Sequence, residues 1–304
     1  MTRTPPGRCM PPPLAQAGRW APADAQRLLP HSLGIACLLA LALGAPDSGQ
    51  AQTPKPDLPG SAPAKVDYAL GVALAYSPTY GGGENYELKP RPVFAVRYGR
   101  FRIATSRGSA LLGYGAGAGI SADLVESERF RIGASLRGDS GRAADDDPAL
   151  AGLPEIRRTL RGRVYATYAL TSNWGLGLTV SQDLLSRGGG ATASTDLSYV
   201  YRLTPKTEWR ASAGLGLGNS QYMRTYYGVS GASAAQTSYA AFDPGGGLTD
   251  VHASLGITSA LSDRWVVFGG LGVSRLQGDA AASPLTRRAT GYSGSIGLVY
   301  RCCN

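Results

Sequence analysis

The stretch Gly291 to Arg301, which reads Gly-Tyr-Ser-Gly-Ser-Ile-Gly-Leu-Val-Tyr-Arg, alternates between two kinds of side chain. One set of alternate positions carries Tyr292, Ile296, Leu298 and Tyr300, and the other carries Ser293, Ser295, Gly297 and Arg301. Because successive side chains of a β-strand point to opposite faces, one face would suit lipid and the other water. A tyrosine near each end is typical of a membrane-spanning strand whose aromatic rings lie at the two headgroup levels.

A closed barrel needs a first strand that can pair with this last one. Residues 68–76 show the same pattern, in which small or polar side chains alternate with Tyr68, Leu70, Val72, Leu74 and Tyr76. The tyrosines are again eight residues apart. At ~3.3 Å per residue and a tilt near 40°, eight residues rise about 20 Å, close to the roughly 25 Å apolar band of outer-membrane barrels.

The beginning of the chain reads as an export signal. Four arginines precede an apolar run from Leu33 to Leu43, and Gly49-Gln50-Ala51 offers a small-x-small cleavage site. We predict a secretory signal peptide at residues 1–51, with a later start at Met10 as an alternative explanation of its long basic region. The apolar run is too short for a membrane-spanning helix of about 20 residues. We expect a Pro-rich periplasmic lead-in at 52–65 and the barrel at 66–304.

The composition agrees with a chain of many strands and turns. It has 304 residues, 42 of them glycine, a net charge of +9 and 43% hydrophobic residues. No long helical periodicity is visible. Cleavage would leave only Cys302 and Cys303, and because neighbouring cysteines bridge only with strain we expect no disulfide framework.

Alternation along the whole chain predicts an all-β fold, a transmembrane antiparallel up-and-down β-barrel of about twelve strands. The strands are expected at 66–77, 86–98, 101–106, 110–121, 130–137, 157–170, 174–185, 192–203, 208–219, 248–261, 265–276 and 291–301. Short connections after strands 2, 6, 8 and 10 and longer ones after strands 1, 5, 7, 9 and 11 fit periplasmic turns and outer loops. The two connections of the fourth strand fit this alternation least well.

Aromatic residues mark one end of the predicted strands. A single ring at the periplasmic membrane level would contain Tyr68, Phe101, Phe130, Trp174, Trp209, Trp265 and Tyr300. Such amphipathic rings are favoured at membrane interfaces. The alternative is that they are core aromatics of a soluble β-sandwich, but the signal peptide and the alternating connections argue against it.

Polar faces of the strands suggest what lies inside. Gly-alternating runs at 113–119, 175–177 and 214–218 are not followed by helices, so they fit a narrow lumen better than a phosphate-binding loop. The same alternation predicts a basic lumen wall made of Arg91, Arg97, Arg102, Arg129, Arg131, Arg137, Arg161 and Arg163. These arginines could pair with acids of folded-in loops, with Asp145, Asp146 and Asp147 as candidates, or could select anionic solutes.

One group of residues has the composition of a hydrolase site. Asp250, His252 and Ser254 share a strand face, and this spacing could align a base with a nucleophile. A lipase acting from the membrane would present them to lipid, whereas here the lipid face is predicted to carry Val251, Leu255 and Ile257. We therefore predict no enzymatic activity, no cofactor and no metal site, and no nucleic-acid-binding module is visible.

Three motifs resemble those of the MltA-interacting protein (MipA/OmpV) family. The first is Gly71-Val-Ala-Leu-Ala-Tyr-Ser-Pro-Thr-Tyr80 with the following Leu88-Lys-Pro-Arg-Pro92 and Tyr98-Gly-Arg-Phe101. The second is Tyr226-Tyr-Gly-Val-Ser230, and the third is Leu276-Gln-Gly-Asp-Ala-Ala-Ala-Ser-Pro-Leu285. The resemblance covers residues 66 to 301.

This resemblance implies a barrel in the outer membrane of a Gram-negative cell. The barrel would contact outer-membrane lipid and lipopolysaccharide and be inserted by the barrel-assembly machinery. In the founding branch of the family the role is a scaffold between a lytic transglycosylase and a penicillin-binding protein. A narrow, anion-preferring pore for small solutes is the alternative. The family usually ends in Tyr-x-Phe, whereas this chain has Tyr300-Arg301-Cys302, so the terminal signal for assembly is altered.

Overall fold

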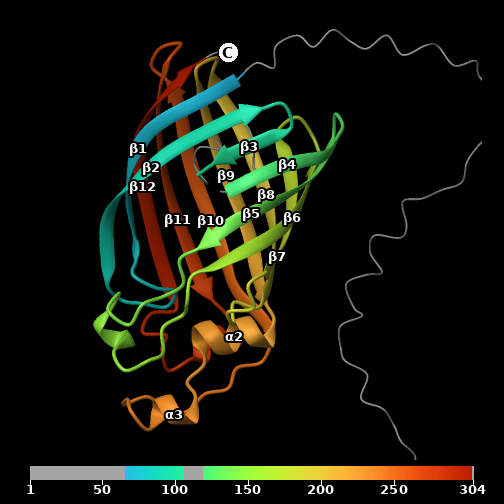
Figure 1. The fold of residues 1–304 in the computed structure, drawn as a ribbon. Helices are drawn as coiled ribbons and strands as arrows, with labels where there is room; N and C mark the ends of the chain where they lie inside the picture. Colours follow the sequence, from blue (N-terminus) through green and yellow to red (C-terminus); the bar gives the residue numbers. More distant parts are fainter. Residues whose placement is uncertain (1–65, 106–118, 303–304) are drawn as a thin grey trace, which may run out of the picture. The chain divides into compact units, whose positions relative to one another are not determined.

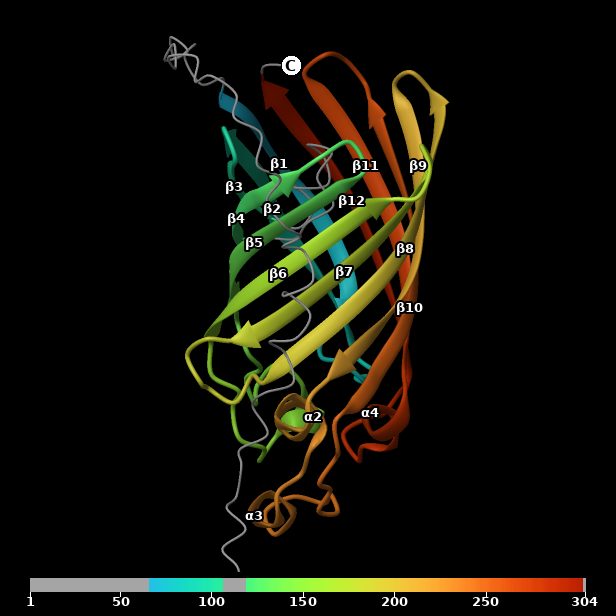
Figure 2. The same cartoon turned by 90° about the vertical axis from the view of Figure 1, so that its right-hand side faces the viewer.

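The computed structural model describes residues 66–105 and 119–302. Within these residues, twelve antiparallel strands close into one barrel, in which each strand pairs with its sequence neighbours and the last pairs with the first (Figures 1 and 2). The predicted barrel class and strand number are therefore confirmed. The predicted signal peptide, the lead-in at 52–65 and the last two residues lie outside the described part of the chain.

The strands are long and follow the alternating stretches of the sequence. They are β1 Val66–Pro78, β2 Tyr86–Tyr98, β3 Phe101–Ala104, β4 Gly119–Glu126, β5 Phe130–Asp139, β6 Thr159–Ala169, β7 Trp174–Asp183, β8 Ala191–Thr204, β9 Thr207–Gly218, β10 Gly247–Ala260, β11 Trp265–Leu276 and β12 Thr290–Cys302.

The barrel closes where the sequence indicated. β1 and β12 pair in one continuous register from Tyr68 opposite Cys302 to Tyr76 opposite Gly294. Closure leaves no free sheet edge in this seam, and backbone groups there are paired as a lipid environment demands. Cys302 is disulfide-bonded, although the sequence predicted no disulfide framework.

The two ends of the barrel differ in their connections. At one end, here called the turn end, the connections are 99–100, 127–129, 170–173, 205–206 and 261–264; the opposite loop end has 79–85, 140–158, 184–190, 219–246 and 277–289. β1 begins at the turn end, and α2 (Ser220–Tyr227) lies across the loop end (Figure 1). The alternation of short and long connections therefore holds for the described strands.

The predicted fourth strand at 110–121 ends too early, because β4 continues to Glu126. β4 begins at Gly119, and Ala122 lies opposite Phe101 of β3. The register between β4 and β5 shifts between Asp123 and Val125. This irregularity places both Leu124 and Val125 on the exposed surface, which breaks the two-residue period and hides the strand in the sequence. Residues 106–118, including most of the first glycine run, lie outside the described residues.

The strand faces separate apolar from polar side chains. Most exposed large side chains of the strands are aliphatic or aromatic, and those of β1 and β12 include Leu70, Val72, Leu74, Ile296 and Leu298. The lumen side is mostly polar or small, apart from an apolar cluster that β1, β2, β3, β11 and β12 share: Ala69, Ala73, Val93, Ala95, Ala104, Phe268 and Val299.

Glycines inside the barrel make room for the largest lumen side chains. Tyr165 lies directly opposite Gly133, and Phe268 lies directly opposite Gly297. A Cβ at either glycine would collide with the facing aromatic ring. The glycine-rich faces are thus part of lumen packing, as a small barrel interior requires.

The loops of the loop end pack together into a structure that we call the cap. It contains η3 (Pro148–Leu150), α2, α3 (Gly231–Ala234) and α4 (Gly278–Ala282). One buried cluster joins Tyr80, Leu150, Leu153, Val229 and Leu285 from four different loops, and a second joins Met223 and Tyr227 of α2 to Leu276 and Ala280. No helix in the described ranges is long and apolar enough to cross a membrane.

Candidate functional site

The eight arginines of the predicted lumen wall do not form one continuous surface. Arg129 lies in the 127–129 turn, and Arg97 and Arg131 lie near the turn end of β2 and β5. Arg91 lies on β2 opposite Ala73 of β1. Arg102 is buried on β3 directly opposite Arg97. The remaining three gather near the loop end on β5 and β6: Arg137, Arg161 and Arg163.

Arg102 is held by a buried polar network. Its side chain is 2% exposed, and its Nη2 lies 2.8 Å from Asp123 Oδ1. The hydroxyl of Tyr165 donates to the same Asp123 oxygen at 2.7 Å and accepts from Arg102 Nη2 at 3.0 Å. A buried guanidinium that is paired in this way braces the wall between β3, β4 and β6 and leaves little charge for a solute.

Arg161 is also committed to the protein. Its Nε lies 2.7 Å from Asp139 Oδ2, and its Nη2 donates to the Gly189 carbonyl at 2.8 Å. Its guanidinium lies 5.7 Å from the ring centre of Tyr222 in α2. Arg161 therefore links the β5–β6 wall, the β7–β8 loop and the cap.

Arg137 and Arg163 differ from the other two. In the described ranges no carboxylate lies within ion-pair distance of either guanidinium. The two groups lie close enough to repel each other electrostatically. With Arg161 they line a cavity of about 290 Å3 whose other lining side chains are Asp139, Thr179, Ser181, Thr192, Ser194, Tyr222 and Tyr226.

The candidate acids Asp146 and Asp147 bind other partners, and it is Asp139, where the predicted loop begins, that pairs with Arg161. Asp147 Oδ2 accepts from Thr79 Oγ1 at 2.6 Å and from Asn85 at 3.2 Å, and Asp146 accepts from the backbone of Ala143 at 2.8 Å. Burial raises the pKa of Asp147, but the hydrogen bonds from Thr79, the Ala149 N–H and Asn85 outweigh it and lower the pKa overall. These acids hold the cap together.

The tyrosines of α2 close the cavity from the loop end. The Tyr226 hydroxyl donates to Asp139 Oδ2 at 3.2 Å, and the rings of Tyr222 and Tyr226 are 4.6 Å apart. Burial raises the pKa of both phenols. They are therefore neutral hydrogen-bonding groups at physiological pH.

Asp250, His252 and Ser254 do not form the base and nucleophile of a hydrolase. His252 Nδ1 lies 2.9 Å from Asp250, but Nε2 lies 2.9 Å from Asp196 of β8 instead of facing a nucleophile. The Ser254 hydroxyl is 2.8 Å from the Ser212 hydroxyl. Because both ring nitrogens face carboxylates, His252 cannot take a proton from Ser254. No group of three or more metal-binding side chains in the described ranges is placed to hold a metal ion.

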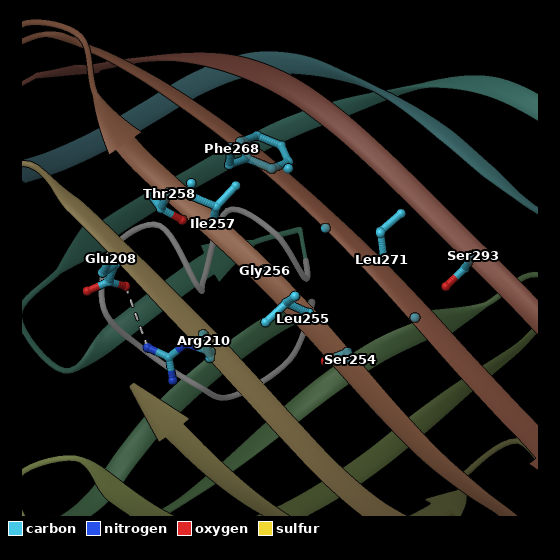
Figure 3. Close-up of a pocket in the computed structure, with 13 residues that line it drawn as sticks. Glu208, Arg210, Ser254, Leu255, Gly256, Ile257, Thr258, Phe268, Leu271 and Ser293 are labelled. Carbon is cyan, nitrogen blue, oxygen red and sulfur yellow. Dashed lines mark ion pairs between the residues drawn. The ribbon is translucent and has the colours of Figure 1, made fainter. Parts of the chain in front are cut away.

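A larger depression lies in the wall formed by β9 to β12. It has a volume of about 310 Å3, and its lining includes the Glu208–Arg210 pair, whose closest atoms are 3.8 Å apart (Figure 3). Figure 3 also labels Ser254, Leu255 and Ile257 along its edge. Because lumen and outward side chains both contribute, this depression is a thin, glycine-rich part of the wall and not an enclosed site.

The predicted aromatic residues all lie at the turn end. Trp265 is opposite Tyr300, and the two rings are 5.4 Å apart. Four further cross-strand pairs follow around the barrel: Tyr98 with Phe101, Phe130 with Tyr168, Trp174 with Tyr199, and Tyr201 with Trp209. The four partners on the even strands were not predicted, although their spacing from the turns could have identified them.

Comparisons with known proteins give one family. A family model described as MltA-interacting protein MipA matches residues 70–302. No curated protein matches the sequence.

Among solved structures, the alignment with the NanC porin covers 77% of this chain and 100% of the porin chain, with 9% sequence identity and a TM-score of 0.42. The alignment with an anion-selective porin from Comamonas acidovorans covers 79% of this chain and 99% of the porin chain, with 11% sequence identity and a TM-score of 0.35. The alignment with the toluene transporter TodX from Pseudomonas putida covers 79% of this chain and 90% of the transporter chain, with 10% sequence identity and a TM-score of 0.34.

Proposed function

The chain belongs to the MltA-interacting protein MipA family, and from this premise we propose that it is an outer-membrane barrel that holds murein enzymes at its periplasmic end. The partners would be a lytic transglycosylase, as the family description suggests, and a penicillin-binding synthase. The barrel itself would perform no catalysis. The observation that carries the proposal is the family match over a complete barrel with an apolar outer surface.

The outer surface supports a membrane location. On β12, Ile296 is 60% exposed and lies midway between Tyr292 and Tyr300. β1 repeats this arrangement with Val72 between Tyr68 and Tyr76. So much exposed apolar surface around a closed barrel is unfavourable in water and suits the hydrocarbon region of a bilayer.

The turn end supports the position of the partner. Short turns of such barrels face the periplasm, where murein enzymes act. The described turns carry Arg100, Arg129, Lys206 and Arg264 against Glu128 and Asp263. A partner with an acidic contact surface would complement this rim, and charge complementarity would speed their association.

A pull-down tests this function directly. Detergent-solubilised barrel should retain the lytic transglycosylase of the same cell, and the triple variant Arg100→Glu, Arg129→Glu, Lys206→Glu should retain less. A matched control variant makes the same change of charge at the loop end, far from the short turns: Arg157→Glu, Arg158→Glu and Arg288→Glu. Wild-type barrel that retains no transglycosylase would contradict the scaffold role, and equal loss in both triple variants would contradict the rim as its contact surface.

A second candidate function is a narrow, anion-preferring pore. It is favoured by the unneutralised positive charge of Arg137 and Arg163 on the lumen side. Reversal potentials in a planar bilayer under a salt gradient should then show anion preference, which Arg137→Gln with Arg163→Gln should reduce. Cation preference, or the absence of any conductance, would reject the pore.

A further inference from the structure

We propose that the cavity beneath α2 binds a small organic anion that carries hydroxyl groups, a polyhydroxy carboxylate. The cavity has a volume of about 290 Å3 and lies between β5–β8 and the tyrosines of α2. This volume is near the lower end of small-molecule sites, which suits a molecule of the size of one sugar acid. The inference does not depend on a murein partner and would hold whether or not the barrel conducts ions.

Charge selects the class of ligand. Arg161 is neutralised by Asp139 at 2.7 Å, so the net positive charge of the cavity comes from Arg137 and Arg163. Two guanidinium groups that line one cavity without an acid paired to either repel each other, and a bound anion would offset that repulsion. The planar guanidinium fork matches a carboxylate in a bidentate geometry.

A buried hydroxyl points to a polar ligand. Ser181 is 7% exposed, and its Oγ is a buried atom without a hydrogen-bond partner in the described part of the chain. Such a group normally has a partner, because leaving it unpaired costs free energy. Thr179, Thr192 and Ser194 add further hydroxyls on the same cavity wall. A ligand with several hydroxyls could satisfy Ser181 and its neighbours together.

The cap supplies the remaining side of the site. Tyr222 and Tyr226 line the cavity with neutral rings, and Tyr226 is already fixed by its hydrogen bond to Asp139 at 3.2 Å. The face of an aromatic ring packs well against the C–H face of a sugar-like molecule. The site therefore combines a cationic wall, a hydroxyl wall and an aromatic roof.

Isothermal titration calorimetry of the purified full barrel tests the proposal with three probes. D-glucuronate carries both the charge and the hydroxyls, acetate carries only the charge, and D-glucose carries only the hydroxyls. We expect glucuronate to bind at least ~10-fold more tightly than either partial probe. Absence of glucuronate binding up to about 10 mM, or equal binding of all three probes, would overturn the proposal.

Variants locate the site. Arg137→Gln and Arg163→Gln should each weaken glucuronate binding ~10-fold or more, whereas Arg91→Gln, the same charge change at a lumen position outside the cavity, should not. Ser181→Ala should weaken glucuronate binding. The free energy of unfolding of the barrel should stay the same or rise, because the substitution removes a buried hydroxyl without a hydrogen-bond partner. Heat-dependent gel migration verifies that each barrel is folded. Equal weakening by Arg91→Gln would show nonspecific attraction by lumen charge and would overturn the assigned site.

Discussion

Placing one arginine at the centre of the outer surface tests the proposed membrane band. Ile296 on β12 is 60% exposed and lies four residues from both Tyr292 and Tyr300. At ~3.3 Å per residue and a tilt near 40°, it lies about 10 Å from each tyrosine level along the barrel axis. Ile296→Arg would therefore place a guanidinium near the middle of the hydrocarbon region.

The expected loss is large only if lipid surrounds this position. An arginine at the bilayer midplane of a barrel costs about 2–4 kcal/mol, and the cost falls to about 0–1 kcal/mol near the interfaces. Leu261 offers a matched control, because it is 62% exposed and begins the short 261–264 turn, where its N–H donates to the Trp265 carbonyl. In water, both substitutions of exposed residues would change stability by about 0.5 kcal/mol or less.

Urea unfolding of the barrel in phospholipid vesicles, followed by tryptophan fluorescence, measures both variants. Ile296→Arg should lower the free energy of unfolding by about 2–4 kcal/mol and Leu261→Arg by about 1 kcal/mol or less. Equal effects of the two substitutions, both within about 0.5 kcal/mol of wild type, would refute a lipid-facing band at Ile296.

Three further predictions concern the ends of the barrel. Cys302→Phe restores an aromatic at the strand end and should raise the amount of folded barrel in outer-membrane fractions; equal amounts would remove this idea. Met223→Ala should destabilise the cap by about 2–5 kcal/mol, because the Met223 side chain is 1% exposed and its loss leaves a cavity. Proteases should then cut the 219–246 loop faster while heat-dependent gel migration stays unchanged, and an unchanged cleavage rate would contradict the packed cap. The pKa of Asp147 in the folded protein is below its usual 3.8, so at a given acidic pH Asp147 is protonated less in the folded cap than in the unfolded chain. The ionised carboxylate therefore stabilises the cap, and this stabilisation is lost as pH falls through the lower, folded-state pKa. Hydrogen exchange of loop-end amides should accelerate in acid more in wild type than in Asp147→Asn, and an identical acid response in the two would count against this role.

The sequence predicted the barrel well because alternation is a local property of each strand, and because the first and last strands carry the same pattern. Tyr68 to Tyr76 and Tyr292 to Tyr300 share a period and a length, and the structure pairs these two stretches directly. The second half of β4 was not predicted, because the register irregularity after Asp123 removes the two-residue period in a strand of only eight residues.

The candidate site was less predictable because it depends on register and on the cap. Alternation predicts that Arg102 and Arg137 both face the lumen. Only the strand pairing shows that Arg102 forms an ion pair with Asp123, whereas no acid in the described residues pairs with Arg137. The role of α2 could not be read from the sequence either. Its tyrosines lie more than fifty residues from the arginines they cover, so packing of long loops decides the site.

Depth-dependent quenching of Trp174, Trp209 and Trp265 measures whether the turn end of the barrel lies at a membrane interface. The barrel without residues 1–51 would be inserted in vesicles whose lipids carry bromine either near the headgroup or near the bilayer centre. Because all three indoles lie at the turn end, we expect strong quenching by bromine near the headgroup and weak quenching by bromine near the bilayer centre. Quenching by aqueous acrylamide alone, or strongest quenching from the bilayer centre, would contradict this expectation.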